Sequence, residues 1–227
     1  MKKISCIIPA YNEGPRIAGV LAAVIDHSLI DEVIVVDDGS TDETRAEAAR
    51  FSSVRLLAHE HNSGKSHAMC TGIRASSGEF LLFLDADLVG LTPEAVTALI
   101  QPVLDGTADT TISLRRDALL PWRAIGLDYL SGERMLHRDL LTKHLDAIEK
   151  LTGYGLESYI NDICLRQKAR ISVVSLAGVG HTYKTRKYGM WKGIAGEVRM
   201  LMNIVETISL AGTANQIIAM WRLRTRD

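Results

Sequence analysis

The chain has 227 residues, of which 47% are hydrophobic and 23% charged, and its formal net charge is −1 at pH 7. This length can bury a full core in one α/β domain, and the nearly balanced charge argues against a nucleic-acid partner. No apolar run approaches the length of a membrane-crossing helix, and we find no signal peptide, repeat or low-complexity segment.

Strands and helices are expected to alternate along the first half of the chain. Short apolar runs predict strands at 4–9, 32–37, 54–58 and 80–85, and amphipathic segments predict helices at 15–26, 43–50, 64–75 and 92–103. Alternation of this kind implies right-handed crossovers and a mostly parallel, twisted sheet with helices on both faces. We therefore expect an α/β fold.

The strand at 80–85 ends in two carboxylates. Asp85 and Asp87 follow an apolar run and are two residues apart, so their side chains should point the same way. At roughly 4–7 Å and an effective dielectric of about 20, they would repel by about 2–4 kcal/mol unless a cation lies beside them. For an isolated pair, the alternative is a polar strand end that turns into a loop.

Two earlier strands also end in polar residues. Val33-Ile-Val-Val36 is followed by Asp37 and Asp38, and the first strand runs through Pro9 into a polar turn. Parallel sheets bind ligands at the carboxyl ends of their strands. A helix cap at Ser40 or Thr41 would explain the turn after Asp38. It would not explain two adjacent aspartates, which can accept hydrogen bonds from ribose hydroxyls or a base N–H.

Four motifs in register resemble those of family 2 glycosyltransferases, which have the GT-A fold. The motifs are Pro9-Ala-Tyr-Asn-Glu13, Val36-Asp-Asp-Gly-Ser-Thr-Asp42, Asn62-Ser-Gly-Lys65 and Asp85-Ala-Asp87. On this resemblance we expect one GT-A domain over 1–227. It would comprise a nucleotide-sugar-binding half (1–105), an acceptor half (106–189) and C-terminal helices (190–227).

The resemblance implies a metal-dependent glycosyltransferase. Its donor would be a UDP- or GDP-linked sugar, its cofactor Mg²⁺ or Mn²⁺, and its acceptor a sugar, another small-molecule hydroxyl or a lipid phosphate, with inversion as the usual outcome. A metal held by carboxylates would stabilise the charge on the departing diphosphate. The implied donor-site residues are Pro9, Tyr11, Glu13, Asp38, Lys65, Asp85 and Lys187.

The implied metal ligands are Asp85, Asp87 and His181. His181 follows Gly180, which would let the backbone approach the metal closely. A basic cluster that includes Lys187 follows His181 and suits a diphosphate or an acceptor phosphate, although a solvated loop is the simpler alternative. The other six histidines, His59 among them, are assigned no role.

The second half is less regular. It predicts a strand at 108–114, a helix at 135–145 after Ser131-Gly-Glu-Arg134, a helix from 153 to 168 and a strand at 171–176. By resemblance, Glu157 is the first candidate for a general base and Asp162 the second. A glutamate in a first helical turn also stabilises the helix, and a lipid-phosphate acceptor, already ionised, would need no base.

Two C-terminal helices are predicted, at 190–208 and 212–226. Both combine apolar and basic residues, with Trp221 and Arg222 in the second. Such helices can lie in a membrane interface, pack on their own domain or form a homodimer. The three cysteines, Cys6, Cys70 and Cys164, have no redox spacing, which predicts a cytoplasmic protein. The two helices add contact with the inner face of the membrane as an option.

Two other functions stay open. A sugar-1-phosphate nucleotidyltransferase would share the sheet and a metal, but Pro9–Pro15 occupies the place of its glycine-rich N-terminal loop. A non-catalytic nucleotide-binding protein would be expected to have lost metal ligands, whereas the expected ligands are all present.

Overall fold

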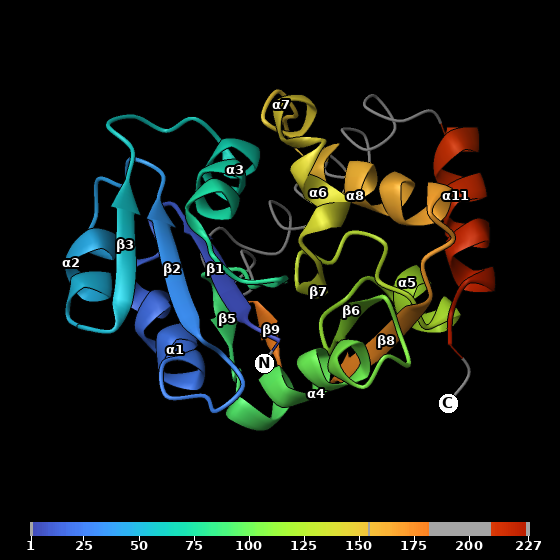
Figure 1. The fold of residues 1–227 in the computed structure, drawn as a ribbon, viewed down its shortest axis with the longest axis horizontal. Coiled ribbons are helices and arrows are strands. Elements are labelled where there is room, and N and C mark those ends of the chain that lie inside the picture. Colours follow the sequence, from blue (N-terminus) through green and yellow to red (C-terminus); the bar gives the residue numbers. More distant parts are fainter. Residues whose placement is uncertain (1, 154, 182–209, 226–227) are drawn as a thin grey trace.

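A computed structural model describes residues 2–153, 155–181 and 210–225 (Figure 1). Its main feature is one seven-stranded sheet with the strand order β3-β2-β1-β4-β7-β6-β8. The strands are β1 (Ile4–Ala10), β2 (Glu32–Asp37), β3 (Val54–Ala58), β4 (Phe80–Phe83), β6 (Thr110–Arg115), β7 (Arg134–His137) and β8 (Ile171–Leu176).

The sheet is mostly parallel, as expected. Only β7 runs antiparallel to its neighbours β4 and β6. The carboxyl ends of the other six strands therefore share one edge, and the amino end of β7 lies at that edge too. The α/β fold class is confirmed, and one sheet continues through the two halves proposed from the sequence.

Helices cover both faces of the sheet (Figure 1). Their apolar faces meet alternate strand residues: in β4, Phe80 and Leu82 pack with α1 and α4, whereas Leu81 and Phe83 pack with α3 and α8. The helices are α1 (Gly14–Val24), α2 (Thr44–Ala49), α3 (Lys65–Ala75), α4 (Pro93–Leu104), α5 (Leu120–Ile125), α6 (Asp139–Thr142), α7 (Leu145–Ile148), α8 (Gly155–Arg166) and α11 (Leu210–Arg222).

The helix predicted at 135–145 is wrong in its first part. Residues 134–137 form β7, paired on one side with Phe80–Phe83 and on the other with residues 110–112. Two short helices, α6 and α7, follow it. Met135 and Leu136 lie on opposite faces of the sheet and are both fully buried. A strand that is buried on both faces lacks the alternation that would distinguish it from a helix.

A second, two-stranded sheet was not predicted. It pairs β5 (Leu88–Val89) with β9 (Gly180–His181), and Leu88 lies opposite His181. Each strand has only two residues, too few for a recognisable pattern. The pairing brings the backbone of His181 beside the residue that follows Asp87.

The last described helix, α11, packs on α8 at the edge of the main sheet (Figure 1). Met220 is fully buried there, and the backbone of residues 223–225 hydrogen-bonds to both sides of Ile171. The helix predicted at 212–226 thus corresponds to α11, while the one at 190–208 lies outside the described residues. Within the described ranges, no helix combines the length and hydrophobicity needed to cross a bilayer.

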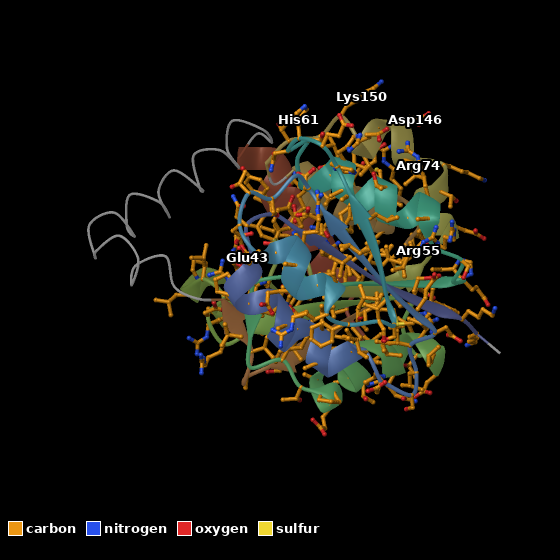
Figure 2. All side chains as sticks on the ribbon, turned by 90° about the vertical axis from the view of Figure 1, so that its left-hand side faces the viewer. Glu43, Arg55, His61, Arg74, Asp146 and Lys150 are labelled. Atoms are coloured by element: carbon orange, nitrogen blue, oxygen red, sulfur yellow. The ribbon has the colours of Figure 1, made fainter. Side chains whose placement is uncertain are left out.

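Polar contacts join the helices on the α3 face of the sheet. Arg74 on α3 forms an ion pair with Glu149 and approaches Asp146 of α7, and Arg74, Asp146 and Lys150 lie near one another in Figure 2. The three cysteines, Cys6, Cys70 and Cys164, are free and buried, and burial with the nearby Glu149 charge raises the pKa of Cys70 to about 11.

Candidate functional site

The polar strand ends meet at the carboxyl edge of the sheet. β1, β2 and β4 end there beside one another, and Gly132 precedes the amino end of β7 at the same edge. Lys65 is the first residue of α3, which packs on β1 and β2. The candidate site is built where these segments converge.

Lys65 binds two carboxylates at once. Its Nζ lies 2.7 Å from Asp85 Oδ1 and 3.0 Å from Glu157 Oε1. Burial by itself would lower the pKa of Lys65, but the charges of Asp85 and Glu157 outweigh it and raise that pKa, so the ammonium group stays charged. The structure therefore brings together three residues that the sequence predicted separately.

Glu157 has an open acceptor atom. Its side chain is buried, with 4% of the residue exposed, and Oε2 has no hydrogen-bond partner among the described residues. A buried carboxylate oxygen without a donor is energetically unfavourable. It is therefore suited to accept a hydrogen bond from a ligand.

A pocket opens beside these side chains. Its lining mixes the charged groups of Lys65, Asp85, Arg134 and Glu157 with apolar side chains. The full set is Pro9, Lys65, Met69, Phe83, Leu84, Asp85, Gly132, Arg134, Leu156, Glu157 and Ile160. Such a mixture is typical of a site that holds a small polar ligand.

Gly132 lies in this wall, close to the ion pair of Lys65 and Asp85. A Cβ atom at this position would lie 2.8 Å from Lys65 Nζ and 2.9 Å from both carboxylate oxygens of Asp85. The sequence singled out Ser131-Gly-Glu-Arg134 but could not show that its glycine touches the ion pair.

A buried ion pair and a buried hydrogen bond hold the residues that follow Gly132 in place. Arg115 Nη1 donates to both carboxylate oxygens of Glu133, at 2.7 and 2.9 Å, and Arg134 Nη1 donates to Asn161 Oδ1 at 3.0 Å. Burial lowers the pKa of Arg115, but the charges of Glu133, Asp128 and Asp85 more than reverse this effect. Sequence reasoning missed Arg115, because nothing local marks it as buried.

Asp87 shares an acidic environment with Glu13. Burial raises the pKa of Glu13, a hydrogen bond from Arg16 opposes this, and the negative charge of Asp87 raises it further. Two carboxylates that repel each other at a sheet edge favour a hard cation. Within the described ranges, no cluster of three or more His, Cys, Asp and Glu side chains is arranged to hold a metal. A metal on Asp85 and Asp87 would thus need ligand oxygens from a substrate or side chains that the structure does not describe, such as that of His181.

Asp38 anchors a loop. Its Oδ1 accepts from Ser63 N at 3.0 Å and from His59 Nδ1 at 2.7 Å, and its Oδ2 accepts from Gly64 N at 2.8 Å. The residue is 3% exposed. The structure therefore places Asp38 directly beneath the turn that leads to Lys65.

The first of the four sequence motifs, Pro9-Ala-Tyr-Asn-Glu13, also lies at this edge of the sheet, at the end of β1. Pro9 lines the pocket and Tyr11 is 46% exposed. Asn12 has a φ of 56°, and its backbone N–H donates to Ser40 Oγ, which ties this turn to the loop after β2.

Three further predicted site residues are Asp162, His181 and Lys187. Asp162 lies on α8 outside the pocket lining and pairs with Arg166, 2.7 Å away. Lys187 lies outside the described residues. Only the backbone of His181 is described, in β9 beside Leu88.

The seven-stranded sheet with helices on both faces is a fold of the GT-A type. The family model "Glycosyl transferase family 2" matches residues 5–159, and the chain belongs to this family. This membership favours a transferase over the nucleotidyltransferase and the non-catalytic alternative.

Named relatives support the family assignment. Glucosyl-3-phosphoglycerate synthase of Mycobacterium tuberculosis is 34% identical over 195 residues, which cover 69% of this chain and 59% of the relative. Dolichyl-phosphate beta-glucosyltransferase of Trichomonas vaginalis is 29% identical over 170 residues, or 69% of this chain and 47% of the relative. The chain thus matches only about half of the length of these relatives.

A solved structure has the same fold. The Mycobacterium tuberculosis glucosyl-3-phosphoglycerate synthase in complex with Mn²⁺, UDP and glucosyl-3-phosphoglycerate aligns with a TM-score of 0.70 and 26% identity. The alignment covers 91% of this chain and 80% of that chain.

Proposed function

We propose that this chain transfers a sugar from a UDP-sugar to a small-molecule hydroxyl, with Mg²⁺ or Mn²⁺ as cofactor. The observation that carries the proposal is the cluster of Lys65, Asp85 and Glu157 at the pocket, where a charged lysine lies beside a carboxylate oxygen that has no hydrogen-bond partner among the described residues. The complexes of the mycobacterial synthase with Mn²⁺ and UDP or UDP-glucose support the choice of donor and metal.

On the donor side, Asp85 and Asp87 would hold the metal, and the side chain of His181 is a further candidate ligand. A bound divalent cation would supply positive charge to the departing diphosphate. Lys65 carries a second positive charge at the same edge, so it would stabilise the leaving group directly. Pro9, Tyr11 and Glu13 would border the nucleotide.

On the acceptor side, Glu157 is the best-placed base. The acceptor oxygen would form a bond to the anomeric carbon, the bond from that carbon to UDP would break, and the acceptor proton would pass to Glu157 Oε2. We propose inversion at the anomeric carbon on this basis. Asp162 is less suited to the role because it lies outside the pocket lining and is bound to Arg166.

The test is a transfer assay with UDP-glucose and either metal. The acceptors to compare are phosphoglyceric acid, glycerol 3-phosphate and a polyprenyl phosphate, a choice guided by the named relatives. UDP release that depends on phosphoglyceric acid or glycerol 3-phosphate, with a product of the expected mass, would support the proposal, and NMR of the product would give its anomeric configuration. No binding of any UDP- or GDP-sugar with either metal would refute it.

We also propose that α11 contributes to a surface contact, with a membrane or with a second copy of the chain. Ile218 and Trp221 on this helix are 51% and 57% exposed, and Arg222 beside them is exposed as well. Co-sedimentation with anionic vesicles and light scattering would test the two options. If replacing Ile218 and Trp221 by serine changes neither result, the proposal is wrong.

A further inference from the structure

His59 bridges two elements of the donor half. Its Nδ1 lies 2.7 Å from Asp38 Oδ1, and its Nε2 lies 3.0 Å from Thr71 Oγ1 on α3. The His59 side chain is 14% exposed and therefore mostly shielded from solvent. A neutral imidazole with its proton on Nδ1 satisfies both contacts, since it donates to Asp38 and accepts from the Thr71 hydroxyl.

Asp38 connects His59 to the backbone of the turn before α3. It accepts hydrogen bonds from the amides of Ser63 and Gly64, so three of its roughly four acceptor positions are used within the chain. Gly64 has a φ of 95°, which places it in the left-handed region. The carboxylate therefore fixes an unusual turn directly before Lys65.

The turn determines where Lys65 points. Gly64 is the N-cap residue of α3, and its carbonyl accepts from Ala68 N at 3.1 Å, so the helix starts from a fixed backbone. Lys65 then reaches Asp85 and Glu157 across the edge of the sheet. A change in the turn would move the ammonium group out of this position.

From this chain of contacts we propose that His59 and Asp38 are positioning residues that hold the Ser63–Gly64 turn and thereby place Lys65 at the diphosphate site. His59 itself is not among the residues that line the pocket. The inference rests on the proposed function, because it assigns Lys65 to the phosphates of the nucleotide. It also gives Asp38 a task other than contact with the base or ribose.

Two substitutions separate the contacts of His59. The amide nitrogen of asparagine can take the place of Nδ1, so His59→Asn keeps a donor for Asp38 and loses the contact with Thr71. His59→Gln places its amide near Nε2, so it keeps the contact with Thr71 and loses the donor for Asp38. His61→Gln is the matched control, since His61 belongs to the same loop and its side chain is exposed (Figure 2).

The measurement is UDP affinity by calorimetry, with Mn²⁺ present, in a double-mutant cycle with Lys65→Met. We expect His59→Gln to weaken UDP binding about tenfold, which matches the loss of one hydrogen bond to a charged group, while His59→Asn and His61→Gln stay within about twofold of the native chain. In the Lys65→Met background, His59→Gln should weaken UDP binding by less than about twofold, because the effects of substitutions at two coupled residues do not add. Asp38→Asn should behave like His59→Gln and replaces it if that variant does not fold.

Equal losses with and without Lys65 would overturn the inference, because His59 and Asp38 would then act on the nucleotide independently of the lysine. Unchanged UDP affinity in His59→Gln would overturn it as well, while leaving the proposed function in place. Absence of nucleotide binding by the native chain would instead remove both.

Discussion

At the scale of single residues, the proposed function places two ligands of opposite charge beside Lys65, a divalent metal ion and the nucleotide. Lys65 neutralises Asp85, so it should oppose a metal ion that arrives alone and favour a nucleotide. We predict that Lys65→Met strengthens Mn²⁺ binding in the absence of nucleotide and weakens UDP binding, each by about tenfold. Electron paramagnetic resonance of free Mn²⁺ and calorimetry with UDP measure the two effects.

Lys150→Met is the control for this experiment, because Lys150 is exposed at the surface (Figure 2). A folding defect would weaken both affinities of Lys65→Met. Only opposite changes therefore agree with the prediction, and weaker Mn²⁺ binding would contradict it.

Glu157 and Asp162 can be distinguished by removing each charge. Because Glu157 is the base candidate that lines the pocket, Glu157→Gln should lower kcat by at least about 100-fold, as expected for loss of a general base. Asp162→Asn should change kcat less than about twofold, since Asp162 lies outside the pocket lining and its partner Arg166 is exposed to solvent. Single-turnover rates give the comparison. A larger effect for Asp162→Asn would reverse the assignment.

Gly132 sets how closely the chain can approach the ion pair. In Gly132→Ala, the added methyl group would contact Lys65 and Asp85 at under 3 Å, so one of them must move. We expect kcat/KM to fall about tenfold or more, as in other sites where a reacting group is displaced. Gly19→Ala on α1 is the control, because a Cβ there meets nothing within 4 Å. Equal activity of Gly132→Ala and Gly19→Ala would show that the pocket wall at residue 132 accommodates a methyl group, and would contradict the prediction.

Local patterns predicted some of these residues and could not predict others. The carboxylates at 85 and 87 follow an apolar strand, and Lys65 follows a recognisable turn, so both could be identified in the sequence. Glu157 is 92 residues from Lys65 along the chain, and their ion pair depends on how α3 and α8 pack. The role proposed for His59 depends on contacts with two separate elements, which no single segment reveals.

At the scale of elements, β7 shows where local patterns fail. Its four residues are too few to show a strand period, and the helical residues after 139 favoured the wrong assignment. The strand is identified by its partners: it fills the space between β4 and β6. The parallel strands β1, β2 and β4 were predicted because each is an isolated apolar run.

Arg138, directly after β7, ties this strand to the end of α3. Its guanidinium donates to the carbonyl of Ile73 at 2.9 Å and to the hydroxyl of Ser76 at 2.8 Å. We predict that Arg138→Met lowers the free energy of unfolding by about 2 kcal/mol, since it removes the hydrogen bonds that a charged donor makes to the Ile73 and Ser76 carbonyls. Urea unfolding measures the change. Arg123→Met on the exposed helix α5 should cost less than about 0.5 kcal/mol, and an equal loss would contradict the prediction.

At the scale of the whole molecule, one continuous sheet joins the two parts of the chain for which we predict donor binding and acceptor binding. The expected α/β fold and its mostly parallel order followed from the alternation of elements in the first half. The small sheet of β5 and β9 could not be predicted, because it joins residues about ninety positions apart through two pairs only. What the sequence suggests for residues 182–209, including Lys187 and the helix expected at 190–208, stays a prediction, since these residues lie outside the described ranges.

Acid should destabilise the fold through its hydrogen-bonded carboxylates. Burial raises the pKa of Glu32, but hydrogen bonds from Ser5, Ser77 and Gly78 outweigh it and leave the pKa below its ordinary value of 4.5. Such a group stabilises the folded state above pH 4.5, and this contribution is lost as the pH falls towards the lowered pKa. Unfolding in urea between pH 7 and pH 3.5 should therefore show falling stability. Glu32→Gln should be less stable than the native chain at pH 7 and lose less on acidification, and an identical pH profile would contradict this.

The position of β7 in the sheet also affects how the chain folds while it is being synthesised. Strands β1 to β4 lie within the first 83 residues and can assemble as soon as they leave the ribosome, but β4 keeps one edge uncovered until residue 137 has been made. That edge consists of Phe80-Leu-Leu-Phe83, an apolar segment of the kind that pairs with other nascent chains. Chaperone demand should therefore peak while the ribosome translates the stretch between these two strands.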